Sequence, residues 1–136
     1  RDGLTNLYNY RYLQTQLQGL MAKRLPQTPV SLVMIDTDNF KIYNDRYGHL
    51  KGNEVLRAIA RVLTSHIRDT DVAARYGGDE FSVLLPETNK EQALAFAERC
   101  VRLIREYKLD ETDSERQLTI SVGIASYPKM LTIRKI

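Results

Sequence analysis

The sequence has little cysteine, no tryptophan and almost no excess charge. It contains one Cys, no Trp, and 20 Lys and Arg against 17 Asp and Glu in 136 residues, for a net charge of +3. A lone Cys100 excludes a disulfide-stabilised secreted scaffold, and its apolar neighbours predict a buried, reduced thiol, as in a cytosolic protein. Because the basic residues are scattered among acids, we expect no nucleic-acid partner.

Long apolar runs are also lacking. A run such as Leu32–Ile35 is far short of the roughly 20 residues that a membrane helix requires, and no cleavable signal pattern opens the chain. We therefore expect a cytoplasmic location, which still allows a membrane anchor in a preceding region of a longer protein. The abrupt start at Arg1 predicts such a longer protein. A chain of this size can bury about two thirds of its unfolded surface, which predicts one domain that folds without disulfides or metals.

Apolar periodicity predicts helices that alternate with strands. The predicted elements are a helix over 10–25 after the N-cap Asn9, a strand over 30–35, a short helix over 40–47, a helix with apolar positions from Val55 to Ile67, strands over 72–76 and 80–85, a helix begun by a Thr88/Glu91 capping box, a loop over 110–116 and a strand over 118–127. The run at 30–35 is apolar throughout most of its length, so it should be central in its sheet. The pair Gly77-Gly78 predicts a hairpin with a type I′ turn.

Two acidic clusters stand at the ends of predicted strands. Asp36 and Asp38 follow the central strand, and Asp79 and Glu80 follow the two glycines. Each cluster alone has a simple explanation, since the first can solvate a strand end and cap a helix, and the second can be part of a turn. If the two strand ends are neighbours, however, Asp36 and Asp79 converge. Convergent carboxylates suit Mg²⁺, and such a site serves phosphoryl or nucleotidyl transfer.

Four blocks of sequence resemble the GGDEF domain of bacterial diguanylate cyclases. They are Asp2-x-Leu4-Thr5, Asp36-x-Asp38-x-Phe40-Lys41-x-x-Asn44-Asp45-x-x-Gly48-His49-x-x-Gly52, Arg75-Tyr-Gly77-Gly78-Asp79-Glu80-Phe81 and Ser121–Ser126. The resemblance implies an α+β fold whose central, mostly antiparallel sheet is flanked by helices, similar to the palm of nucleotidyl cyclases and polymerases. It also implies that a dimer condenses two GTP molecules into cyclic di-GMP and releases pyrophosphate, and that an N-terminal sensory or receiver domain controls it.

The same resemblance implies roles for individual residues. Mg²⁺, or Mn²⁺ in its place, would be held by Asp36, the Thr37 carbonyl, Asp79 and Glu80, while GTP would be bound by Phe40, Lys41, Asn44, His49, Asn53, Gly77 and Gly78. Lys41 would add a charge for the phosphates, and Asp79 or Glu80 would help to deprotonate the attacking ribose hydroxyl. For His49, packing or capping is the competing interpretation.

Arg68-x-x-Asp71 lies where the family has an inhibitory site for its product. Arg68 and Asp71 are therefore predicted to bind cyclic di-GMP, and the alternative is a surface ion pair at a helix end.

The sequence departs from the family at two places. Asn53 stands where an Asp usually pairs with guanine, and residues 129–136 do not match the helix and strand that usually follow, with their phosphate-binding Lys and Arg. The predicted domain is thus 1–128, followed by a non-matching tail. These departures favour an alternative, a weak or inactive module that binds GTP or cyclic di-GMP and signals through partners. A polymerase palm would need a basic template surface, which the charge distribution lacks.

Overall fold

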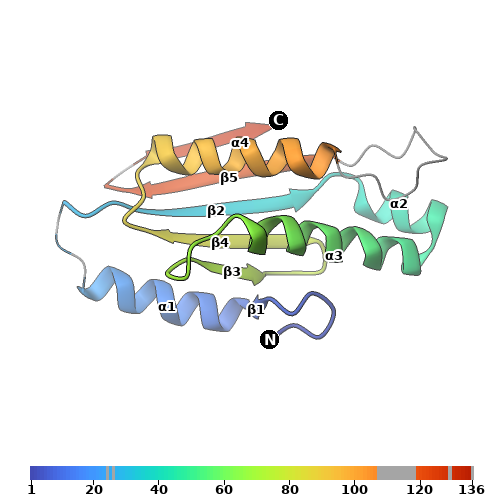
Figure 1. Cartoon of the computed structure of the whole chain (residues 1–136), viewed down its shortest axis with the longest axis horizontal. Coiled ribbons are helices and arrows are strands. Elements are labelled where there is room, and N and C mark those ends of the chain that lie inside the picture. The colour runs from blue at the N-terminus through green and yellow to red at the C-terminus, as the bar shows by residue number, and fades with distance from the viewer. Residues whose placement is uncertain (24, 26, 107–118, 129, 136) are drawn as a thin grey trace.

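A computed structural model describes residues 1–23, 25, 27–106, 119–128 and 130–135, the last six by their backbone alone. Figure 1 shows its helices and strands in chain order. They are β1 (Tyr8–Asn9), α1 (Tyr10–Lys23), β2 (Val30–Thr37), α2 (Phe40–Tyr47), α3 (His49–Ser65), β3 (Val72–Arg75), β4 (Glu80–Pro86), α4 (Lys90–Glu106), β5 (Ile120–Tyr127) and β6 (Met130–Lys135). The predicted loop over 110–116 lies outside the described residues.

The strands form one sheet in the order β1-β3-β4-β2-β5-β6. β1 pairs with β3 in parallel, and all other neighbours are antiparallel. β2 lies between β4 and β5, so the prediction of a central strand is confirmed. The α+β fold with a mostly antiparallel sheet is confirmed as well.

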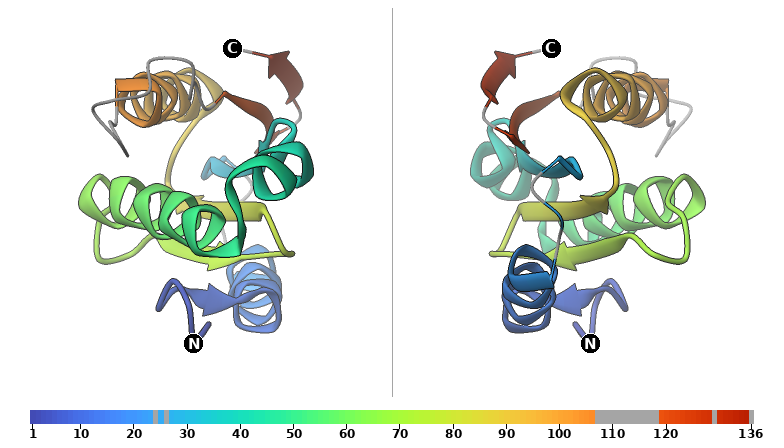
Figure 2. Two further views of the ribbon diagram at one scale, coloured as in Figure 1. Left: turned by 90° about the vertical axis from the view of Figure 1, so that its right-hand side faces the viewer. Right: turned by 90° about the vertical axis from the view of Figure 1, so that its left-hand side faces the viewer.

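The two faces of the sheet are covered differently. Figure 2 shows α3 and α4 together on one face and α1 on the opposite face. Period-2 alternation in the strands explains both layers. In β3, Ala73 joins the large core under α3 and α4, whereas Val72 and Ala74 join a smaller cluster with Leu13 of α1. The sheet is therefore held rigidly from both sides next to β3 and β4.

The structure corrects one predicted helix cap and one predicted turn, and it confirms a second helix cap. The helix α4 begins one residue later than its predicted capping box, because Asn89 Oδ1 accepts from Gln92 N at 2.8 Å and Asn89 N donates to Gln92 Oε1 at 2.9 Å. The type I′ turn is wrong, since neither Gly77 nor Gly78 has a positive φ. The predicted cap of α1 is confirmed, with Asn9 Oδ1 accepting from Tyr12 N at 3.0 Å.

The strand β6 was not predicted from the sequence. It pairs with β5 along its whole length, from Ser126↔Met130 to Ser121↔Lys135. Within the part of the chain that the structure describes, no helix is both long and apolar enough to span a membrane.

Candidate functional site

The acidic clusters predicted to converge are neighbours in the structure. Figure 1 shows the end of β2, the β3–β4 loop and the N-terminal turn at the same end of the molecule as α2. Asp36 on β2 pairs with Glu80 on β4. The main chain of Thr37 donates to Asp79 O at 3.3 Å, and its hydroxyl donates to the same oxygen at 3.2 Å. This double contact joins the end of the central strand to the loop that carries Asp79.

The pKa of Asp36 is raised by burial and by the acids that surround it. Burial, the Asp79 carboxylate and the Asp38 carboxylate raise the pKa of Asp36 above its ordinary value, in that order of importance. Neighbouring carboxylates that repel one another favour either protonation of one of them or the binding of a cation. Among the described residues, no group of three or more His, Cys, Asp or Glu forms a metal site. The donor set nevertheless fits Mg²⁺, which is usually held by one or two carboxylates together with substrate phosphates rather than by a full protein cage.

Asp38 has a structural task that its sequence position did not reveal. Its Oδ1 accepts from Ser121 Oγ at 2.6 Å and its Oδ2 accepts from Thr119 Oγ1 at 2.8 Å. The backbone N of Asp38 also donates to Thr119 O at 3.0 Å. These bonds join the β2–α2 connection to β5 and to Thr119 just before it, and they engage both oxygens of the carboxylate.

The helix α2 begins without a side-chain cap. Asn39 adopts a left-handed conformation, with φ of 56°, and makes no side-chain cap hydrogen bond. The first N–H groups of the helix, at Phe40 and Lys41, therefore lack a side-chain acceptor from the N-cap residue. Amides at a helix N-terminus that lack such a cap favour anions. The predicted phosphate-binding segment thus has suitable local structure, and Lys41 beside it is exposed.

Asn44 and Gly52 form a close contact between α2 and α3. Asn44 Oδ1 is buried and has no hydrogen-bond partner within the described residues. A Cβ on Gly52 would overlap this oxygen and would lie 2.8 Å from Asn44 Cγ. Glycine is therefore needed at position 52 for the amide to lie where it does. An unpaired buried acceptor costs free energy, so this oxygen suits a ligand donor.

The other predicted nucleotide residues lie around this contact. His49 is the first residue of α3 and is exposed, and Asn53 follows Gly52 and is half-buried. Between α2 and α3, Gly48 has a φ of 88°, which only glycine adopts readily. This residue lets the two helices follow each other without a loop.

Arg75 is a residue of this site that the motif alone did not single out. Its guanidinium donates to the backbone carbonyls of Gly77 and Gly78 and to the carboxylate of Asp2. Glu80 lies over the same loop, because a Cβ on Gly77 would be 3.2 Å from Glu80 Oε1. The glycines thus leave room for side chains that fold back over the hairpin.

Arg68 and Asp71 form an ion pair at the opposite end of the sheet. Arg68 Nη2 lies 2.8 Å from Asp71 Oδ1, with side chains that are 54% and 3% exposed. Arg68 Nη2 also donates to Pro86 O and Thr88 Oγ1. A cavity of about 180 Å³ adjoins this pair. It is lined by His66, Arg68, Asp71, Leu85, Thr88, Gln92, Phe96 and Arg99.

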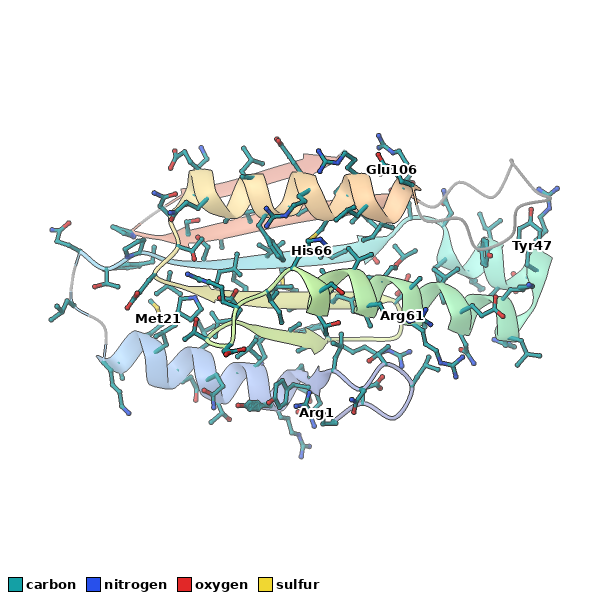
Figure 3. All side chains as sticks on the ribbon, viewed as in Figure 1. Arg1, Met21, Tyr47, Arg61, His66 and Glu106 are labelled. Atoms are coloured by element: carbon teal, nitrogen blue, oxygen red, sulfur yellow. The ribbon has the colours of Figure 1, made fainter. Side chains whose placement is uncertain are left out.

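Figure 3 labels His66 at the end of α3 on this side and Tyr47 at the tip of α2. The cavity beside Arg68 and the acidic site lie at opposite ends of β3, because Asp71 directly precedes that strand and Asp79 lies in the loop that follows it. Arg99 in its lining was not singled out in the sequence, where nothing marks it among the charges of an amphipathic helix.

Known proteins resemble this chain in sequence and in fold. The family described as "Diguanylate cyclase, GGDEF domain" matches residues 1–135, and so includes residues 129–135, which were predicted to lie outside the domain. Diguanylate cyclase A of Treponema denticola is 38% identical over 88% of this chain and 32% of its own length. Response regulator PleD of Caulobacter vibrioides is 41% identical over 92% of this chain and 28% of its own length. The chain thus spans about a third or less of these relatives.

A solved structure has the same fold. The GGDEF domain of DgcB from Caulobacter crescentus, in complex with c-di-GMP, matches with a TM-score of 0.84 and 31% identity. The match covers 92% of this chain and 75% of that one.

Proposed function

This chain belongs to the GGDEF domain family of diguanylate cyclases, and from that premise we propose that it condenses two GTP molecules into cyclic di-GMP. The observation that carries the proposal is the junction of Thr37 with Asp79, which brings the acids of β2 and the hairpin to one end of the sheet. Asp36, the Thr37 carbonyl, Asp79 and Glu80 would hold Mg²⁺ or Mn²⁺. When bound, such a cation lowers the pKa of a hydroxyl and neutralises charge on phosphate.

The residues of the chain then have distinct tasks. The bare amides at Phe40 and Lys41 bind the terminal phosphates, and the Lys41 ammonium adds a positive charge. Asn44 offers its unpaired carbonyl to a donor of the guanine base, with His49 and Asn53 nearby. Asp79 or Glu80 accepts the proton of the ribose 3′-hydroxyl, which attacks the α-phosphate of the other nucleotide while pyrophosphate leaves.

The product requires two copies of the site. Each domain holds one GTP, and cyclic di-GMP has two new phosphodiester bonds, so two domains must face each other. Gly77 and Gly78 add little bulk at the hairpin, which helps two nucleotides to approach. A neighbouring sensory or receiver domain in the full-length protein would control this encounter.

Incubation with GTP and Mg²⁺, followed by chromatography for cyclic di-GMP, tests the proposal. Asp79→Ala should abolish turnover while the fold survives, since removing one of two repelling carboxylates rarely destabilises a protein. Asp69→Ala, at an exposed acid outside the site, is the matched control and should retain activity. If the unaltered protein binds GTP but makes no product, the alternative of a binding module replaces the enzyme.

We also propose that Arg68 and Asp71 bind cyclic di-GMP. The cavity beside them supports this proposal, because Arg68 and Arg99 both line it and the Arg68 side chain is 54% exposed. Two guanidinium groups suit phosphate and the acceptor edge of guanine. The buried Asp71 contributes by orienting Arg68.

A further inference from the structure

The side chain of Arg75 folds over the hairpin loop that begins beside it. Nε donates to Gly77 O at 3.3 Å and to Gly78 O at 3.2 Å, and Nη2 donates to Gly78 O at 2.7 Å. The next carbonyl, of Asp79, accepts from Thr37. Three successive carbonyls of the loop are thus held by side chains outside it.

The other end of the guanidinium is held by the N-terminal turn. Arg75 Nη1 lies 3.2 Å from both oxygens of Asp2. Asp2 Oδ2 also accepts from Thr5 N at 2.8 Å and from Thr5 Oγ1 at 2.7 Å. The backbone N of Asp2 donates to Leu7 O at 2.6 Å, and Leu7 is buried in the core. Asp2 is therefore part of a closed turn anchored in the core.

The ion pair is mostly shielded from water. The side chains of Arg75 and Asp2 are 19% and 22% exposed. Burial alone would raise the pKa of Asp2, but the hydrogen bonds from Thr5 and the charge of Arg75 outweigh it and lower that pKa. Charge-assisted bonds in such surroundings are stronger than surface pairs. A planar guanidinium can serve a carboxylate and two carbonyls at once, whereas a Lys ammonium cannot reach all three.

We propose that Arg75 is a positioning residue for the loop that carries Asp79 and Glu80, and that Asp2 fixes Arg75 in this role. The N-terminal turn and the acidic loop then behave as one unit, although 73 positions separate Asp2 from Arg75. A displacement of the turn would release the two glycine carbonyls and change the direction of the Asp79 side chain. The kinetic part of this proposal rests on the proposed function, but the coupling itself does not.

Amide hydrogen exchange tests the coupling without any nucleotide. The reporters are Gly77 N–H, bonded to Glu80 O, and Thr37 N–H, bonded to Asp79 O. Asp2→Asn and Arg75→Lys should each make both reporters exchange about tenfold faster, since a charge-assisted bond is lost. The amide of Val83, in the middle of β4, should be unaffected. Unchanged reporters in both variants would overturn the proposal.

Matched substitutions separate coupling from general destabilisation. Asp69→Asn and Arg57→Lys change the same residue types at exposed positions, and both should leave the reporters unchanged. Faster exchange at Val83 by the same factor would mean that the pair only stabilises the fold, which also overturns the proposal. If Asp2→Asn does not fold, Thr5→Val removes one support of Asp2, and a smaller effect in the same direction is expected.

Kinetics give the second readout. Because the nucleotide contacts of α2 are untouched, Arg75→Lys should lower kcat for cyclic di-GMP formation about tenfold and leave KM for GTP within about twofold. A rise in KM at constant kcat would contradict the positioning role. If the unaltered protein lacks turnover, the proposed function fails, while the exchange experiment still decides whether Asp2 and Arg75 control the loop.

Discussion

The contact between Gly52 and Asn44 allows a quantitative test of nucleotide recognition. Gly52→Ala places a methyl group on Asn44 Oδ1, and this Cβ would also lie 3.3 Å from Phe40 Cζ. The Asn44 amide is a side chain that can rotate away. Overpacking costs about 1 to 3 kcal/mol, and the helix gains about 1 kcal/mol when glycine is replaced by alanine. The free energy of unfolding should thus fall by only about 0 to 2 kcal/mol.

The effect on GTP should be larger than the effect on stability. Rotation of Asn44 removes the acceptor that we assign to the guanine base, and leaving a guanine donor unpaired costs about 1 to 3 kcal/mol. This corresponds to a dissociation constant about 5 to 150 times higher. Calorimetric titration with GTP and Mg²⁺, together with thermal denaturation of the free protein, measures both quantities.

A double-mutant cycle and a control complete the experiment. Asn44→Ala should weaken GTP binding by a similar factor, and the double variant should bind no worse than Asn44→Ala, because both changes remove the same contact. Gly19→Ala, on α1 with nothing within 4 Å of the new Cβ, should stabilise the protein by about 1 kcal/mol and leave binding unchanged. A folded Gly52→Ala protein with the original GTP affinity would show that Asn44 does not read the base.

Three further predictions concern single side chains. The pKa of Asp36 is raised, so the charged carboxylate opposes folding at a pH above that pKa. Asp36→Asn should therefore raise Tm at pH 7 in the absence of metal, and the difference in Tm should disappear at about pH 3. A lower Tm at pH 7 would contradict this reasoning. Arg68→Ala should remove calorimetric binding of cyclic di-GMP but not of GTP, and should lower Tm because Asp71 loses its partner; retained binding would reduce the pair to a structural role. Asn53→Asp should tighten GTP binding about 5- to 150-fold and increase the ratio of GTP to ATP affinity, since a carboxylate accepts from both guanine donors. An unchanged ratio would mean that Asn53 does not contact the base.

Much of the fold could be predicted because its signals are local. The short helix has the predicted bounds, 40–47, and the apolar run at 30–35 correctly indicated the central strand. The capping box was placed one residue early, since Asn89 and Gln92 compete with Thr88 and Glu91 for the same task. Thr88 is instead buried and donates to Pro86 O. A choice between adjacent polar residues depends on packing, which periodicity does not encode.

The parts of the site that depend on distant contacts could not be predicted. The acids at the two strand ends were identified from their positions after strands. The engagement of Asp38 by Ser121 depends on a pairing 83 residues apart. The turn type was wrong because β3 pairs with β4 only as far as Arg75↔Phe81, so the loop between them is longer than the two residues of a type I′ hairpin. A glycine pair indicates where a chain reverses, but strand register determines the length of the loop.

The uncapped start of α2 has a consequence for the energetics of the free protein. A side-chain cap is typically worth about 1 kcal/mol, and Asn39 does not supply one. An anion that occupies those amides would therefore act as the missing cap. Such a ligand binds the folded state alone, so Tm should rise with its concentration even when no reaction occurs. The empty protein thus lacks the stability of a capped helix, and bound nucleotide restores it with the logarithm of the nucleotide concentration.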